Sequence, residues 1–189
     1  MSTKMPASSG SARAEALQKL LHTLFIELFQ TERSADAHSR REAGRLGDEP
    51  PAQALRAVSS HANGGLLEIS VLAASRCFSD TRWGMAVGSL FSSIRDLLAD
   101  RLIDRERSYR GTLLGMRHGM DLMRSLRGVA RSAGDTELSA YCEAWLEGRA
   151  PLVDAVAAEL SWFATHPARA LEGGKGSLRG SLARMPGMR

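Results

Sequence analysis

The stretch 17-LQKLLHTLFIELF-29 indicates which kind of fold this chain adopts. Its apolar residues recur every three or four positions, which is the spacing of one face of an α-helix. They are Leu17, Leu20, Leu21, Leu24, Phe25, Leu28 and Phe29. The helix is expected over residues 11–45 and should end before Gly47, Pro50 and Pro51. A long helix with one apolar face requires other helices to cover that face.

Three more helical runs follow, and no segment has the pattern of a strand. The helices are expected over residues 51–78, 104–133 and 136–165. Asp135 or Thr136 is expected to cap the last of them, and Gly148 with Pro151 predicts a kink or break inside it. No segment alternates polar and apolar residues over the length of a strand. The predicted fold class is therefore all-α, a bundle of four long helices.

The chain divides into this bundle and two terminal segments. Residues 1–10 are expected to be a disordered lead, residues 11–167 the bundle, and residues 168–189 a flexible basic tail. Between the second and third helices, residues 84–102 carry apolar side chains at helical spacing and predict a crossover helix. These side chains are Leu90, Phe91, Ile94, Leu98 and Leu102.

The net charge of the chain is concentrated in its tail. The formal net charge is +4, and residues 173–189 contain four basic residues and no acid. They are Lys175, Arg179, Arg184 and Arg189. Because the rest of the chain is neutral, the high isoelectric point of the whole chain does not indicate a basic face that binds nucleic acid. The run 95-RDLLADRLIDRERSYR-110 mixes both signs, which is typical of an ion-paired helix surface.

The cysteines and the N-terminus bear on the expected compartment. Cys77 and Cys142 lie far apart in helical runs, so they predict small buried apolar side chains and no disulfide framework. The first residues lack the apolar core of a secretory signal. No run approaches the ~18 apolar residues that span a membrane. The expected location is the cytoplasm, with neither a membrane nor a nucleic acid as partner.

Three glycines recur on one face of the helix expected over residues 104–133. Gly111, Gly115 and Gly119 stand four residues apart. Each costs a helix roughly 1 kcal/mol relative to alanine, so a compensating contact is expected. Either another helix packs closely against this face, or the face leaves room for a ligand or metal.

Several segments resemble the ferritin-like superfamily, most closely its small YciF-like branch of stress-associated proteins. They are 26-IELFQTER-33, the surroundings of His61, 117-RHGMD-121 and 130-ARSAGDTELSAYCEAWLEGR-149. The resemblance covers residues 14–165 and is one of layout more than of identity. It implies a four-helix bundle with a crossover helix between the second and third helices.

The resemblance also implies a di-iron site, with ferroxidase activity if the site is complete. Its tentative metal ligands in this chain are Glu27, Glu32, His61, His118 and Glu147. Ferritin-like sites use a Glu from each of two helices and a Glu-x-x-His from each of the other two. This chain departs from that pattern, because Val58 precedes His61 where a Glu is needed and Arg117 and Met120 flank His118. The alternative is that these polar residues pair within the bundle or lie on solvated faces. A buried Arg117 near Glu32 or Glu147 could then replace the metal charge with an ion pair.

The tail, 173-GGKGSLRGSLARMPGMR-189, resembles the C-terminal peptides that load cargo into encapsulin nanocompartments. In such peptides a Gly-Ser-Leu core precedes basic residues, and 180-GSLAR-184 is similar to that core. The resemblance implies an encapsulin shell protein as partner. The residues that would bind it are Leu178, Gly180, Ser181 and Leu182. Arg179 departs from the pattern, which has an aliphatic residue there. Plain disorder and weak phosphate binding are the alternatives.

Two hypotheses follow from the sequence. In the first, the protein is a ferritin-like encapsulin cargo connected with iron or oxidative-stress handling. In the second, it is a metal-free bundle of the same fold whose glycine face forms a homodimer or higher homo-oligomer and whose tail docks a partner.

Overall fold

The computed structural model describes residues 9–78 and 104–173, and within these ranges every regular element is a helix. The helices are α1 (Ser9–Leu46), α2 (Pro50–Ser75), α4 (Arg105–Ala133), α5 (Thr136–Ala158), α6 (Leu160–Thr165) and α7 (Pro167–Ala170). The all-α prediction is thus confirmed for this part of the chain. The expected crossover over residues 84–102 and most of the expected lead and tail lie outside the described residues.

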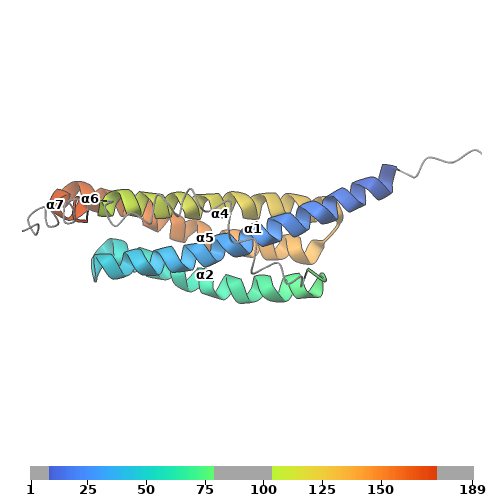
Figure 1. Ribbon diagram of the computed structural model, residues 1–189, viewed down its shortest axis with the longest axis horizontal. Helices are drawn as coiled ribbons and strands as arrows, with labels where there is room; N and C mark the ends of the chain where they lie inside the picture. Colours follow the sequence, from blue (N-terminus) through green and yellow to red (C-terminus); the bar gives the residue numbers. More distant parts are fainter. Residues whose placement is uncertain (1–8, 79–103, 174–189) are drawn as a thin grey trace, which may run out of the picture.

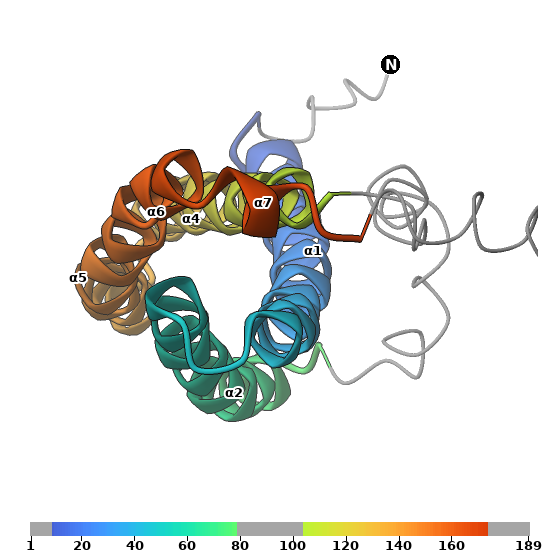
Figure 2. The ribbon, with the colours of Figure 1, turned by 90° about the vertical axis from the view of Figure 1, so that its left-hand side faces the viewer.

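The four long helices pack side by side in a bundle (Figure 1). Viewed along the bundle axis, α1 lies between α2 and α4, and α5 closes the ring between α4 and α2 (Figure 2). Helix α2 runs back along α1, α4 runs parallel to α2, and α5 runs back along α4 (Figure 1). The end of α2 and the beginning of α4 therefore lie at opposite ends of the bundle.

Glycine and aspartate define the helix ends that the sequence predicts. Gly47 and Gly134 follow α1 and α4 with φ of 70° and 73°, a left-handed conformation that glycine adopts without strain. Asp135 caps α5, because its Oδ1 accepts a hydrogen bond of 2.9 Å from the backbone N–H of Leu138. Of the two cap candidates, Asp135 is therefore the one that the structure uses.

Helix α2 ends three residues before the predicted boundary at Phe78. Cys77 lies beyond the end of α2 with a φ of 57°, and its side chain is exposed. The expectation that both cysteines are buried is therefore wrong for Cys77, because the helix ends before it can place that side chain inside. Cys142, in the middle of a packed helix face, is buried.

The last long helix breaks later than its sequence predicts. Helix α5 continues through Pro151, and the interruption falls at Glu159, before α6. Proline removes one helical hydrogen bond, to the carbonyl four residues earlier, at Glu147. Both Pro151 and Glu147 are exposed, so water can reach the carbonyl that loses its partner. Helix α5 is therefore unbroken at Gly148 and Pro151, where the sequence predicts a kink or a break.

The core is a continuous column of apolar side chains between the four long helices. Fully buried examples from α1, α2, α4 and α5 are Phe25, Leu28, Leu55, Ile69, Leu126, Leu138 and Val156. Tyr109 is also fully buried, and its hydroxyl donates a hydrogen bond of 2.9 Å to the backbone carbonyl of Val156. No helix in the described ranges combines the length and apolar character that a membrane crossing requires.

Candidate functional site

A buried ionic cluster joins three of the four long helices. Arg149 of α5 pairs through Nη2 with Oε2 of Glu32 on α1, and each side chain is only 1% exposed. The Nε of the same guanidinium donates a hydrogen bond of 3.2 Å to Nδ1 of His61 on α2. Arg149 thus connects Glu32, 117 positions earlier in the sequence, with His61, 88 positions earlier.

The hydrogen bond from Arg149 fixes the tautomer of His61. Arginine has only donors, so Nδ1 of the imidazole must accept, and the ring proton is on Nε2. Burial, together with the positive charge of Arg149, lowers the pKa of His61 to about 4. His61 is therefore neutral at neutral pH. It accepts a hydrogen bond in this cluster and carries no charge.

The carboxyl group of Glu32 is held in an environment that disfavours its ionised form. Burial raises the pKa of Glu32 to about 7, although the charge of Arg149 opposes this shift. Burial also lowers the pKa of Arg149, against the attraction of Glu32. A guanidinium nevertheless keeps its proton in proteins, so the permanent charge of the cluster resides on Arg149.

Two aromatic side chains complete the surroundings of the cluster. Trp145 lies under the guanidinium of Arg149, 4.7 Å from Cζ to the ring centre, and meets the ring of His61 edge-on. Its buried Nε1 makes no hydrogen bond of ordinary geometry within the described ranges, but it lies close enough to Glu32 to oppose the rise in that pKa. The buried hydroxyl of Tyr141 also lacks a partner there. Aromatic stacking on a desolvated guanidinium stabilises it by about 2 kcal/mol.

Three glycines leave the space that the cluster occupies. A Cβ at Gly65 would lie 3.3 Å from Oε2 of Glu32, and one at Gly148 would lie 2.9 Å from Nε2 of His61. At Gly119 a Cβ would lie 3.0 Å from Cγ2 of Thr31, the neighbour of Glu32 on α1. Glycine at these positions lets α2, α4 and α5 approach the polar centre closely.

Within the glycine stripe of α4, Gly119 is therefore a close-packing position and Gly115 is an open one. We expect Gly115→Ala to raise the free energy of unfolding by about 1 kcal/mol, because nothing lies within 4 Å of its added Cβ and alanine favours helix. Gly119→Ala should show no such gain, since its Cβ would crowd the stiff side chain of Thr31. Urea denaturation of both variants measures the difference, and equal effects would rule out close packing at Gly119.

The structure brings together only some of the predicted metal ligands. Glu32 and His61 meet at Arg149, whereas His118 and Glu147 are exposed and Glu27 is half-buried. Among the described residues no group of three or more His, Cys, Asp or Glu side chains is close enough to hold a metal ion. The predicted buried role of Arg117 is wrong, because Arg117 is exposed on α4. Arg149 supplies the buried cation in its place.

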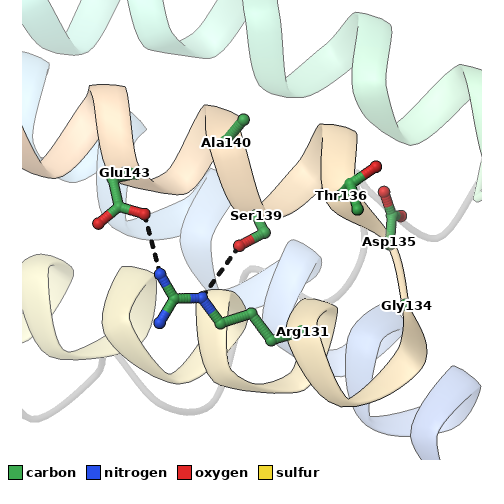
Figure 3. Close-up of a pocket in the computed structure, with 7 residues that line it drawn as sticks. All are labelled: Arg131, Gly134, Asp135, Thr136, Ser139, Ala140 and Glu143. Atoms are coloured by element: carbon green, nitrogen blue, oxygen red, sulfur yellow. Dashed lines mark hydrogen bonds and ion pairs between the residues drawn. The ribbon is translucent and has the colours of Figure 1, made fainter.

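A second polar group lies at the turn between α4 and α5, where a shallow surface pocket of about 340 Å³ opens (Figure 3). Arg131 crosses it, donating hydrogen bonds of 2.9 Å to Oε2 of Glu143 and 3.2 Å to Oγ of Ser139. In Figure 3 Arg131 bonds to Ser139 and Glu143, and the residues drawn are largely exposed. This pocket therefore has the character of an ion-paired surface and not of a reaction site.

Comparison with known proteins gives no match: no family model, curated protein or solved structure aligns significantly with this chain.

Proposed function

We propose that this protein is a metal-free interaction protein, a helical bundle that carries its C-terminal tail to an encapsulin shell protein. The observation that supports the metal-free part is the position of Arg149 between Glu32 and His61, two of the ligands that the ferritin-like resemblance implies. In this proposal the guanidinium supplies the positive charge that iron supplies in related bundles.

The direction of the helices supports a ferritin-like topology. Helix α2 is parallel to α4, while α1 with α2 and α4 with α5 form antiparallel pairs (Figure 1). A bundle in which only the second connection joins parallel helices is the arrangement with one long crossover, as in ferritin-like folds.

The donor set of the cluster does not suit an iron ion. The carboxylate of Glu32 and Nδ1 of His61 both face the guanidinium, so an added cation would stand beside a buried positive charge. Hard or borderline cations need several anionic oxygens close together, and Glu32 is the only acidic residue in this cluster. We therefore derive no catalytic step for this site.

The end of the bundle suits a tethered tail. Arg169 pairs with Glu49 at 2.9 Å, and the carbonyl of Glu172 accepts a hydrogen bond of 3.1 Å from the backbone N–H of Arg105. These contacts anchor the chain to the bundle as far as Glu172, immediately before residues 173–189. The tail therefore begins at this end of the bundle, and several tails on an oligomer would bind a multivalent shell by avidity.

Metal analysis tests the metal-free part of the proposal. Protein purified from cells grown in iron-rich medium is expected to contain far less than one iron per chain and to cause no oxygen uptake with Fe(II). An enzymatic assay alone does not suffice, so iron content is measured independently by elemental analysis. Two tightly bound irons per chain would replace the proposal by the ferroxidase hypothesis with Glu27, Glu32, His61, His118 and Glu147 as ligands.

Co-expression with an encapsulin shell protein tests the tail. We expect assembled shells to retain the full chain and to lose it when residues 173–189 are deleted. The double variant Leu178→Ser/Leu182→Ser should be lost in the same way, because it removes the apolar anchors. The matched control is Met185→Ser/Met188→Ser, which changes two apolar residues beyond 180-GSLAR-184 and should be retained. Retention of the deletion variant would show that the tail is not the loading signal.

A further inference from the structure

A shallow apolar groove lies on the outside of the bundle between α2 and α5. Its volume is about 440 Å³, and its lining consists of Leu67, Glu68, Val71, Leu72, Glu137 and Tyr141. Leu67 and Val71 stand about one turn apart on α2 and are 70% and 69% exposed. Side by side at the groove, these two side chains form a contiguous exposed apolar surface, the kind that marks interaction sites.

The rim of the groove is acidic. Glu68 forms no ion pair with any described residue, and its exposed carboxylate follows directly after Leu67. Glu137 pairs with Arg76 at 3.1 Å, yet its side chain remains 75% exposed. The surface therefore favours an occupant that combines apolar anchors with positive charge.

We propose that the groove binds residues 174–189 of a second copy of this chain. That segment carries Leu178 and Leu182 four positions apart, with basic residues and no acid. Its leucines would pack against the apolar floor formed by α2 and Tyr141, and its arginines would pair with Glu68 and Glu137. The proposal does not depend on the encapsulin shell.

The length of the chain explains why the tail comes from a second copy. Gly173 follows α7 at the end of the bundle where α4 begins, whereas Tyr141 lies near the start of α5, toward the opposite end (Figure 1). From Tyr141 to Ala158 helix α5 rises about 26 Å, and α6 adds about 8 Å. From Gly173 to Leu178 an extended chain reaches at most about 18 Å. Leu178 therefore cannot enter the groove of its own chain.

Reciprocal exchange of tails would make a dimer with two such contacts related by a two-fold axis. Each contact is small, but the second forms within an already associated pair, which raises the overall affinity. Because opposite charges meet at the rim, dimerisation is also expected to weaken with added salt.

Sedimentation equilibrium of the full chain tests the proposal. We expect a dimer whose dissociation constant rises at least tenfold in Val71→Glu, in Glu68→Lys and in the tail variant Leu178→Ser/Leu182→Ser. The control Leu114→Ser changes a leucine on α4 that is 63% exposed, and it should leave the constant unchanged. Circular dichroism identifies any variant that fails to fold, and it is applied to the tail variant as well.

Two results would overturn the inference. One is a full chain that stays monomeric at the highest concentrations measured. The other is a dimer that Val71→Glu dissociates while the tail variant remains dimeric, which would mean that two grooves pack face to face. Val71→Glu leaves the tail sequence unchanged, so shell loading of this variant distinguishes a failure of the loading proposal from a failure of this inference.

Discussion

Arg149→Met is expected to lower the free energy of unfolding by about 3–5 kcal/mol, the range for removing one partner of a buried ion pair. The substitution leaves the carboxyl group of Glu32 buried with no cation beside it, and it removes the donor to Nδ1 of His61. Glu32 then takes up a proton, so the loss should be smaller at pH 5 than at pH 8. Urea denaturation followed by circular dichroism at both pH values measures the effect.

A double variant separates the ion pair from simple loss of packing. In Glu32→Leu/Arg149→Met both charges are replaced by apolar side chains, and such replacements are often neutral or stabilising. We expect the double variant to recover most of the stability that Arg149→Met loses, which gives a large coupling energy between the two sites. Equal destabilisation in the single and double variants would mean that residue volume at position 149, and not charge, sets the loss.

The pH dependence of stability should reveal two opposing titrations in the cluster. The pKa of Glu32 rises from 4.5 to about 7 on folding, so its contribution is fully present below pH 4.5 and is lost as the pH rises through 7. The pKa of His61 falls from 6.5 to about 4, so its contribution is present above pH 6.5 and is lost as the pH falls through 4. Between pH 4.5 and 6.5 the stability contributed by Glu32 falls with rising pH, while that contributed by His61 rises.

Single substitutions isolate the pH dependence of stability that each of the two groups contributes. His61→Gln leaves the contribution of Glu32, and its free energy of unfolding should fall by about 3 kcal/mol between pH 4.5 and 7 relative to the double variant Glu32→Gln/His61→Gln. Glu32→Gln should instead become more stable as the pH rises from 4 to 6.5. Burial lowers the pKa of His38 as well, but it adds the same slope to both variants. Curves of the same slope in both variants would contradict the assigned pKa shifts.

The helical register explains why much of the fold could be predicted from the sequence. Of the apolar face of residues 17–29, Leu21, Leu24, Phe25 and Leu28 lie in the core, whereas Leu20 is 45% exposed. The residues Gly47, Gly134 and Asp135 lie at the predicted helix ends. These features depend on neighbouring residues, so sequence patterns report them. The behaviour of Pro151 depends instead on which way its face of α5 points, and that is decided by the other helices.

The sequence analysis does not predict that Arg149 is buried, although the spacing of the buried residues on α5 indicates it. The buried positions of α5 are Leu138, Cys142, Trp145, Leu146, Arg149, Val153 and Val156. Arg149 stands at the interval of three and four expected of a core residue, just as Glu32 follows Leu28 on α1. Opposite charges at apolar positions of two helices are a detectable signal. The metal-ligand pattern instead predicts roles for Arg117, His118 and Glu147, which lie at exposed positions.

The ionic cluster also has a consequence for how the helices align. The core is formed largely by leucine, alanine and other aliphatic side chains, which tolerate many alternative matches between neighbouring helices. Sliding α5 by one turn, about 5.4 Å, would put Trp145 or Val153 where Arg149 meets Glu32. Both charges would then be buried without a partner. The three-helix cluster thus favours a single longitudinal alignment of α1, α2 and α5.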